Sequence, residues 1–351
     1  MSCRRGMLTG GPGGVNTIRP MSRGIAFLTG GTGFVGSHAA RALSAEGWSV
    51  RALARRPETL AARRLADMPV DIVAGDLLER SGETLRDALR GCQAIVHVAG
   101  LVKARSLADY RETNVRATER LVAAGNASAP GALFVLVSSQ AAAGPARDGR
   151  AVREEDPPRP ISWYGLSKHE GETAVARDWK GPWIVLRPSV VYGPGDRGLL
   201  TLFAAAARGW VPVPAGSSRI QLIHASRAAL GIARAAGRPD LAGRTGFLTD
   251  PDPIRIRDLA AALARLPARR ARLVRIPAVL VRAAGAVETL REALTGASRP
   301  FNSDKAREIL AGDWLCAPAL QGELNLPPPL PLEAELLDTW NWYQKEGWLA
   351  S

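Results

Sequence analysis

A glycine-rich turn between an apolar run and a helix-forming segment constrains this chain more than any other feature. Residues 24–29 have the apolar composition of a buried parallel strand, and residues 37–46 follow as a helix. Between them, Gly30, Gly33 and Gly36 have a GxxGxxG spacing. In such a unit the glycines permit a tight turn, close approach of the backbone to a pyrophosphate, and close packing of the helix on the strand. Because the helix N-terminus then faces the anion, the segment predicts a dinucleotide-binding site.

Further strand patterns follow at intervals typical of a doubly wound sheet. They cover Ser49–Ala54, Val70–Ala74, residues 94–98 and Leu133–Val137, and a helix is predicted over residues 83–90. Strands that alternate with helices in this way predict a mostly parallel sheet covered on both faces.

The end of the second strand indicates which dinucleotide is preferred. In this kind of fold an acidic residue there binds the ribose 2′-hydroxyl of NAD, whereas an arginine suits the 2′-phosphate of NADP. The chain has Arg55 and Arg56 at that place and no acid. The sequence therefore favours NADP(H) over NAD(H), with Arg55 as the reader of the phosphate. The alternative is that both are ordinary surface arginines.

A second group of residues suggests acid–base chemistry. Ser138 and Ser139 follow the strand Leu133–Val137, at the edge where open α/β sheets place their active sites. Tyr164 and Lys168 are four residues apart in a segment predicted as a helix over residues 163–177, so they share one helix face. A nearby ammonium group is expected to lower the pKa of the phenol, which would make Tyr164 a usable acid or base.

The combination of these motifs resembles the short-chain dehydrogenase/reductase superfamily, and in its order and linkers the extended branch, the NAD-dependent epimerase/dehydratase group. The matching segments are TGGTGFVG (29–36), GDL (75–77), HVAG (97–100), TNVRAT (113–118), VSSQAAAG (137–144), EEDPPRP (154–160), YGLSK (164–168) and LRPSVVYGPGD (186–196). The resemblance covers about residues 22–230. It implies an α/β fold with a Rossmann-type doubly wound parallel sheet and a smaller, mixed C-terminal lobe that binds the substrate.

The resemblance also implies roles for single residues. Tyr164 resembles the acid/base, Lys168 its pKa-lowering and ribose-binding partner, and Ser139 the residue that holds the substrate oxygen, with Ser138 as the less favoured candidate. The implied cofactor site consists of Gly30, Thr32, Gly33, Phe34, Val35, Gly36, Arg55, Asp76, Leu77, Val98, Ala99, Tyr164, Lys168, Pro188 and Val191. In this site Asp76 would contact the adenine. The pocket for adenine and ribose would be lined by Leu77, Val98 and Ala99. The nicotinamide would be lined by Pro188 and Val191. Asn114 matches a turn near the active site.

The implied activity is hydride transfer between a nicotinamide cofactor and a carbonyl or alcohol substrate, in an NADP(H)-preferring oxidoreductase. One alternative is an NAD-dependent nucleotide-sugar epimerase or dehydratase. Residues 222–227 lack the acidic pair that members acting on sugar nucleotides carry, which puts that substrate in doubt. Arg219 and His224, in or next to this segment, are interpreted as a surface or strand-edge arginine and a packed histidine. The other alternative is a non-catalytic dinucleotide-binding scaffold or sensor.

The chain divides into three parts in this interpretation. Residues 1–21 are Gly- and Pro-rich and predict a disordered extension, or one that arises from too early a start codon. Residues 22–197 form the nucleotide-binding domain, to which a segment near 219–250 returns. Residues 198–351 are mainly the substrate lobe and C-terminal helices.

The C-terminal part contains two longer helices of interest. Residues 332–348 predict an amphipathic helix whose tryptophans we assign to the core. Residues 277–295 predict an apolar helix with arginines at intervals. We favour core packing for this helix too; the alternatives are a membrane surface or a partner subunit.

Charge and cysteine content limit the partners. The net charge of +13 comes mainly from arginines spread along the chain, and no basic stripe with interleaved aromatics indicates nucleic acid. No apolar run is long enough to span a membrane, which leaves peripheral contact as the only membrane option. Three separate cysteines and four scattered histidines suggest a cytoplasmic protein without disulfides or metal. A small-molecule substrate is expected, and the resemblance leaves a homodimer open.

Overall fold

The structure is a computed structural model that describes residues 23–79, 82–216, 218–296 and 301–349. The predicted N-terminal extension, residues 1–21, lies outside the described residues.

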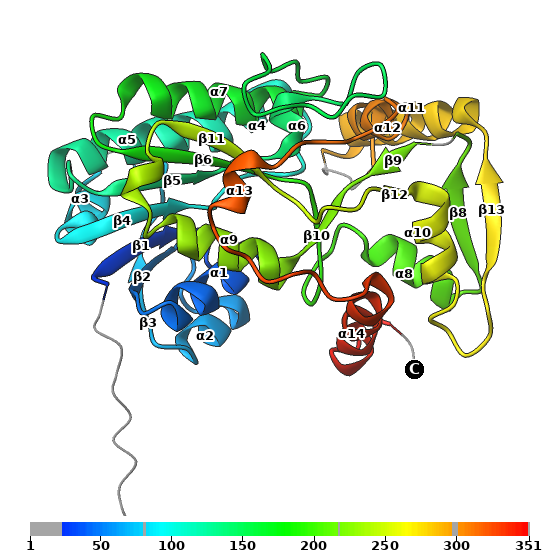
Figure 1. The fold of residues 1–351 in the computed structure, drawn as a ribbon, viewed down its shortest axis with the longest axis horizontal. Coiled ribbons are helices and arrows are strands. Elements are labelled where there is room, and N and C mark those ends of the chain that lie inside the picture. The colour runs from blue at the N-terminus through cyan, green and yellow to red at the C-terminus, as the bar shows by residue number, and fades with distance from the viewer. Residues whose placement is uncertain (1–22, 80–81, 217, 297–300, 350–351) are drawn as a thin grey trace, which may run out of the picture.

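A parallel sheet forms the centre of the N-terminal domain (Figure 1). Its strands are β1 (Ile25–Thr29), β2 (Ser49–Ala54), β3 (Val70–Ala74), β4 (Cys92–His97), β5 (Leu133–Val137), β6 (Trp183–Pro188) and β11 (Arg244–Leu248). Their order across the sheet is β11-β6-β5-β4-β1-β2-β3, and every neighbouring pair is parallel. The order reverses between β1 and β4, which is the switch point where such sheets bind their ligands. The predicted Rossmann-type sheet is therefore confirmed.

Helices cover both faces of this sheet (Figure 1). On one face lie α1 (Phe34–Ala45), α2 (Leu60–Ala66) and α9 (Ala225–Ala235), and on the other α3 (Glu83–Leu89), α5 (Ala117–Ser128) and α7 (Trp163–Asp178). Because both faces are buried, the central strands are apolar on both sides, and all five residues of β5 are buried. Helix α1 begins three residues earlier than predicted, since Ser37 N already donates to Gly33 O at 2.9 Å.

Short helical pieces connect the main layers. They are α4 (Leu107–Arg111), a π-helix (Glu112–Arg116), α6 (Gln140–Ala143), a 3₁₀ turn (Pro239–Leu241) and α13 (Ala319–Gly322). Helix α4, the π-helix and α5 follow one another without a break, so the crossover after β4 is one irregular helical rod.

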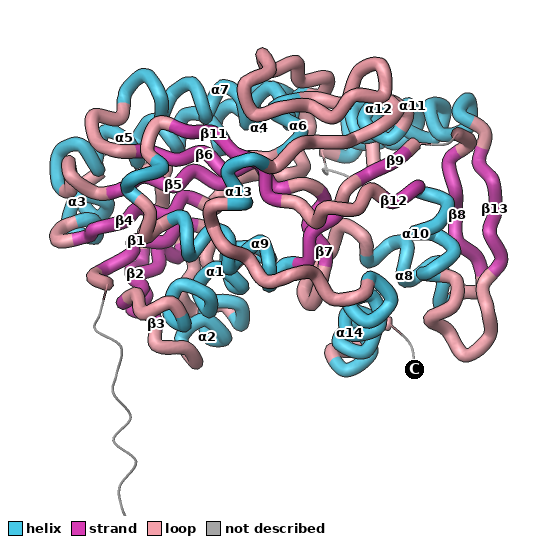
Figure 2. The backbone as a smooth tube through the Cα atoms, in the orientation of Figure 1, coloured by secondary structure: helices cyan, strands magenta, loops and turns pink. Residues whose placement is uncertain are grey.

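The C-terminal lobe contains short strand pairs and five helices among its described residues (Figure 2). The strands are β7 (Val190–Tyr192), β8 (Trp210–Pro214), β9 (Arg219–Ile220), β10 (Leu222–His224), β12 (Ile254–Arg255) and β13 (Arg272–Ile276). They pair as β7 with β10, β8 with β13 and β9 with β12. The helices are α8 (Leu200–Ala207), α10 (Ile256–Leu263), α11 (Ala278–Thr295), α12 (Ser303–Ile309) and α14 (Leu332–Lys345).

Helix α14 closes the core of this lobe. Trp340 and Tyr343 are buried there against Phe203 and Leu263. The prediction that the tryptophan-bearing C-terminal helix packs into a core is therefore confirmed for Trp340.

The expectation of core packing is wrong for α11. Only Val281, Gly285 and Glu292 of its 18 residues are buried. Its large apolar side chains at 279, 280, 287, 290 and 294 are exposed. The physical reason is that α11 packs mainly against helix α12, and most of its surface away from α12 is exposed.

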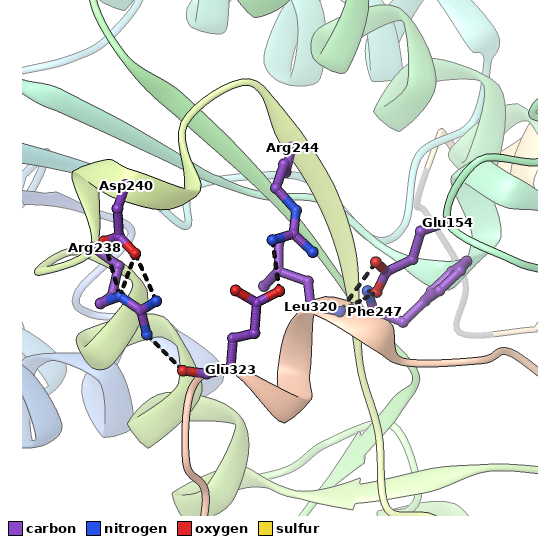
Figure 3. Close-up of polar contacts among 7 residues, drawn as sticks. All are labelled: Glu154, Arg238, Asp240, Arg244, Phe247, Leu320 and Glu323. Atoms are coloured by element: carbon purple, nitrogen blue, oxygen red, sulfur yellow. Dashed lines mark hydrogen bonds and ion pairs between the residues drawn. The ribbon is translucent and has the colours of Figure 1, made fainter.

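The chain returns from the lobe to the edge of the main sheet (Figure 3). There the Glu154 carboxylate accepts hydrogen bonds from the backbone N–H of Phe247 in β11 at 3.0 Å and of Leu320 in α13 at 3.0 Å. Next to it, Arg244 pairs with Glu323 at 2.6 Å. These contacts attach α13 to β11, the outermost strand of the sheet.

Candidate active site

The glycine turn leaves no room for side chains where the phosphates of a dinucleotide would lie. Gly30 has a φ of +74°, and a Cβ built on it would lie 2.6 Å from the backbone N of Ala99. A Cβ on Gly36 would lie 1.9 Å from Gly30 O. Helix α1 then begins at Phe34, after Gly33 as its N-cap, without a side-chain cap and without an acid in its first turn. Its first N–H groups are thus available for an anion, and the residues fit a pyrophosphate.

The other predicted cofactor residues lie around this turn or at strand ends beside it. Thr32 is exposed, whereas Phe34 and Val35 are half-buried at the start of α1. Val98 and Ala99 follow β4 and are half-buried, and Leu77 is buried just beyond β3. Asp76 keeps its own turn closed, since its Oδ1 accepts from Leu78 N at 3.0 Å.

Arg55 and Arg56 are exposed at the end of β2. Neither side chain forms an ion pair with any residue that the structure describes, in a chain where many arginines are paired. The position at the end of β2 therefore offers unneutralised positive charge beside the glycine turn.

His97 is a buried residue with hydrogen-bond partners at both ring nitrogens, rather than an acid or base. Its Nδ1 accepts from the Thr29 hydroxyl at 2.6 Å, and its Nε2–H donates to Thr118 Oγ1 at 2.9 Å. The Thr118 hydroxyl in turn donates to Asn114 O at 2.8 Å. Because the Thr118 hydroxyl proton goes to Asn114 O, its oxygen must accept from Nε2–H, which leaves Nδ1 as the acceptor for the Thr29 hydroxyl. Burial, with a smaller contribution from the charge of Lys168, lowers the pKa of His97 to about 3, so the ring is neutral.

The two serines after β5 have separate roles. Ser138 is buried and donates to Glu172 Oε1 at 2.5 Å. The same carboxylate is held by Arg187 through two bonds of 2.9 and 2.7 Å. Ser139 is half-buried and caps α6 through Ala141 N at 3.2 Å, and its hydroxyl lies near enough to the Tyr164 phenol to oppose the rise of the phenol's pKa. The structure thus brings Ser139, not Ser138, to Tyr164.

Tyr164 and Lys168 lie in the first two turns of α7. Lys168 is buried and its Nζ donates to the backbone carbonyl of Val137 at 2.8 Å. Burial raises the pKa of Tyr164 to about 12, although the nearby Ser139 hydroxyl opposes the rise, and burial lowers the pKa of Lys168 to about 8. The expected lowering of the Tyr164 pKa by Lys168 is not seen. The reason is that the ammonium group is bonded to Val137 O, while burial dominates at the phenol.

Asn114 positions the loop beside this pair. It lies in the π-helix, a type of irregularity that is frequent at functional sites. Its side chain bonds Leu101 N at 2.6 Å and Ser167 Oγ at 2.9 Å. A Cβ on Gly100 would lie 3.3 Å from Asn114 Oδ1 and 3.5 Å from Lys168 Nζ, so the end of the β4 loop passes directly over both.

The chain after β6 approaches the glycine turn from the other side. Pro188 is buried at the end of β6 and Val191 is half-buried in β7. His38 of α1 bonds the Pro194 carbonyl at 2.8 Å, and a Cβ on Gly195 would lie 3.6 Å from the Phe34 ring. The loop that leads into the C-terminal lobe therefore lies against the start of α1.

Sequence reasoning missed the acids that hold α7 in place. Glu172 continues the spacing of four from Tyr164 and Lys168, a signal that could have placed it on the same helix face. At the start of α7, Asp304 of α12 accepts from Trp163 N at 3.0 Å, and Glu308 accepts from the Ser162 hydroxyl at 2.5 Å. These acids lie about 140 residues away in sequence, so no local pattern indicates them.

The remaining polar candidates have structural partners. Arg219 is bonded to Asp313 at 2.6 Å, as expected for a strand-edge arginine. His224 is buried against Tyr192, with ring centroids 5.5 Å apart, and its Nδ1 lies 2.8 Å from Ser226 Oγ. Within the described ranges, no cluster of three metal-ligating side chains and no helix able to span a bilayer is present.

Comparisons with known proteins agree with this geometry. The sequence matches the NAD-dependent epimerase/dehydratase family over residues 26–245. The chain belongs to this family.

Relatives in this family include reductases and epimerases. The chain is 34% identical to a ceramide reductase of Caulobacter vibrioides, over 93% of this chain and 97% of that protein. It is 32% identical to the 4-hydroxy-2-methyl-3-oxo-4-farnesyl-3,4-dihydroquinoline-1-oxide ketoreductase of Stigmatella aurantiaca, over 81% of this chain and 90% of that one. A dTDP-glucose 4,6-dehydratase from Streptomyces venezuelae, solved with NAD, has the same fold with a TM-score of 0.73, at 22% identity over 93% of this chain and 99% of that one.

Family membership also decides between enzyme and scaffold. The protein is an NAD(P)-dependent enzyme of the extended short-chain dehydrogenase/reductase type. The alternative of a non-catalytic scaffold is not supported by these relatives.

Proposed function

We propose that this protein is an NADPH-dependent ketoreductase that acts on a long-chain, lipid-like ketone. The observation that carries the reaction is the placement of the Ser139 hydroxyl next to the Tyr164 phenol, one helical turn from the buried ammonium of Lys168. The substrate class rests on the relatives. A ceramide reductase aligns with nearly the whole chain, and a ketoreductase of a farnesylated quinoline with most of it.

The side chains suit proton delivery to a reduced carbonyl. NADPH, when bound, supplies the hydride. The Ser139 hydroxyl is placed to donate a hydrogen bond to the substrate oxygen and to polarise the carbonyl. Tyr164, whose pKa is raised to about 12, keeps its proton at neutral pH and can give it to the oxygen as the alcohol forms. Lys168 lies one helical turn further along α7, where it can hold a ribose hydroxyl and favour the phenolate that remains.

Each part of the cofactor has residues that suit it. The free N-terminus of α1 and the glycine turn suit the pyrophosphate, and the side chains of Leu77, Val98 and Ala99 suit the adenine and ribose. Arg55 would supply charge to the 2′-phosphate, which supports NADPH over NADH. Pro188 and Val191 would line the nicotinamide side.

The main alternative is epimerase or dehydratase chemistry on a nucleotide sugar. Arg219 would be the guanidinium for a diphosphate, but it is already bonded to Asp313 at 2.6 Å. Residues 222–227 also lack the acidic pair expected for such substrates. Both observations favour the ketoreductase.

The decisive experiment is turnover of a long-chain 3-oxo ceramide with NADPH by the wild type and by Tyr164→Phe. Loss of the proton donor should lower kcat by about 10²–10⁴-fold, while the Kd for NADPH changes less than about twofold. Tyr110→Phe is the matched control, since its ring lies 6.1 Å from that of Tyr164 and its hydroxyl bonds only backbone. Unchanged turnover in Tyr164→Phe would disprove the assignment. Retained NAD with an isomerised sugar product and no net NADPH consumption would establish the epimerase instead.

A further inference from the structure

Helix α11 has a buried stripe on one side and an exposed apolar stripe on the opposite side. The buried stripe, at Val281, Gly285 and Glu292, faces α12, and a Cβ on Gly285 would lie 2.9 Å from Ala306 Cβ. The other stripe is exposed. Its members are Val279 (66% exposed), Leu280 (55%), Val287 (50%), Leu290 (60%) and Leu294 (77%). At 3.6 residues per turn these five positions occupy an arc of about 100°, roughly opposite the buried stripe.

Positive charge gathers in the segment that runs through β13 into α11. Residues 259–287 contain no acid and six arginines, at 265, 269, 270, 272, 275 and 282. In the described part of the chain none of the six forms an ion pair. This segment departs from the otherwise even spread of arginines, and it accounts for a large share of the net charge of +13.

Strand β13 and helix α11 present these groups together. Only Pro277 separates them, and they lie at the edge of the molecule farthest from the main sheet (Figure 1). In β13, Leu273 and Val274 are 39% and 40% exposed, although they are consecutive and point to opposite sides of the strand. The edge thus combines exposed aliphatic side chains with unpaired guanidinium groups.

We propose that this edge, β13 and the exposed stripe of α11, is a docking surface for a bilayer that contains anionic phospholipid. The aliphatic side chains would enter the boundary between headgroups and acyl chains, with α11 lying in the plane of the membrane. The guanidinium groups of β13 and of Arg282 would meet the lipid phosphates, for which their planar donors are well suited. A membrane-bound helix of this kind has the same pattern of an apolar stripe with flanking cations.

Charge decides between a bilayer and a second copy of the chain. An interface between two copies through this edge would place Arg272, Arg275 and Arg282 of one copy near the same arginines of the other. The acids of α11 do not compensate them, because Glu288 is bonded to Arg291 and Glu292 is buried. An anionic lipid surface neutralises the same charges, so the electrostatics favour the bilayer.

The edge is one helix away from the candidate active site. Helix α12 packs on α11 through Ala306 and bonds the start of α7 through Asp304, next to Tyr164. A cavity of about 400 Å³ lies at this junction, lined by Ile161, Ala306, Leu310 and Arg282, among others. Docking would therefore bring a lipid source near the catalytic helix. The docking itself does not depend on the proposed function, because it requires neither cofactor nor ketone.

The test is co-sedimentation of the full chain with vesicles of phosphatidylcholine alone or of an equimolar mixture with phosphatidylglycerol. We expect binding to the anionic vesicles only, and weakening of it at high salt. Replacing Arg272, Arg275 and Arg282 by alanine should weaken binding by about a hundredfold, at roughly fivefold for each arginine. Leu290→Asp with Leu294→Asp should weaken it at least about tenfold.

Two controls separate docking from folding. Leu330→Asp with Leu337→Asp places the same charges on apolar side chains that are 66% and 47% exposed at or just before α14, and should bind as the wild type does. The thermal unfolding midpoint of every variant should match that of the wild type, because the replaced side chains are exposed.

Three results would overturn the proposal. The first is no binding of the wild type to anionic vesicles, and the second is binding that the α11 and β13 variants leave unchanged. The third is self-association in sedimentation velocity that Leu290→Asp with Leu294→Asp abolishes, which would assign the edge to a second copy.

Discussion

At the scale of single residues, partners rather than residue type decide which polar groups are available for chemistry. Ser138 and Ser139 are the same residue type and adjacent in sequence. Ser138, however, is hydrogen-bonded at 2.5 Å to the Glu172 carboxylate, which is also bonded to Arg187. Ser139 faces the Tyr164 phenol instead. In the same way, each ring nitrogen of His97 is hydrogen-bonded to a threonine hydroxyl and the ring is neutral. His97 therefore cannot serve as an acid near neutral pH.

Arg55 is the residue on which the cofactor preference depends. Arg55→Glu would replace an unpaired cation by an anion next to the expected 2′-phosphate. We expect the Kd for NADPH to rise at least about tenfold and that for NADH to change less than about threefold, measured by fluorescence titration. Arg63→Glu, on the exposed side of α2, is the control with the same charge change. Equal effects on the two cofactors would remove Arg55 from the site.

The pKa of Lys168 predicts a pH dependence. Since burial lowers this pKa to about 8, the ammonium loses its proton above that pH, whereas Tyr164, with a pKa raised to about 12, stays protonated. The value of kcat/KM for NADPH, which reports the free enzyme, should therefore be constant below pH 8 and fall above it. A profile that stays flat to pH 10 would contradict the role of the charged lysine.

At the scale of elements, the strand–turn–helix unit and α7 are built differently. The glycine turn is a local structure, since Gly33 N bonds Gly30 O at 2.9 Å and Ser37 N bonds Gly33 O at 2.9 Å. Helix α7 instead depends on distant partners at its start, where Asp304 and Glu308 accept from Trp163 N and Ser162. Acids at a helix N-terminus are favourable for the helix dipole, so α12 stabilises the helix that carries Tyr164 and Lys168.

The close approach within the turn can be tested at Gly36. In Gly36→Ala the new Cβ would meet Gly30 O at 1.9 Å, so β1 and α1 must separate. We expect a Kd for NADPH at least about tenfold higher and a lower unfolding midpoint, measured by titration and by circular dichroism. Gly131→Ala is the matched control, because a Cβ there meets nothing within 4 Å. Wild-type binding in Gly36→Ala would mean that the phosphates do not lie on this turn.

At the scale of the whole molecule, the C-terminal chain returns to the sheet and fixes the lobe to the domain. Glu154 is central to this junction (Figure 3). Its carboxylate accepts from β11 and α13 together, at 3.0 Å from Phe247 N and 3.0 Å from Leu320 N. A second contact joins the C-terminal helix to the preceding chain, since Tyr343 of α14 donates to Asp196 O at 2.6 Å, in the loop that lies against α1.

Removal of this carboxylate should destabilise the whole chain. Glu154→Ala leaves two backbone donors without a partner, which costs about 1–3 kcal/mol each. We expect a loss of about 2–5 kcal/mol in the free energy of unfolding by urea, with the Kd for NADPH unchanged at low temperature. Glu155→Ala, an exposed neighbour, should have almost no effect. Equal stability of the two variants would show that the junction contributes little.

The sequence by itself determined the parallel sheet, the glycine turn and the placement of Tyr164 and Lys168 on one helix face. These features depend on residues close together along the chain, so the pattern of apolar residues and glycines is enough to predict them.

Only the tertiary structure decided which serine is available, why the Tyr164 pKa is raised, and that α11 is exposed. Glu172, Asp304 and the missing neighbours of α11 belong to contacts between distant segments, and burial and hydrogen-bond partners are set by those contacts. A pattern of apolar residues shows that a surface needs to be covered. It does not show whether the protein itself covers it, and for α11 the described chain does not.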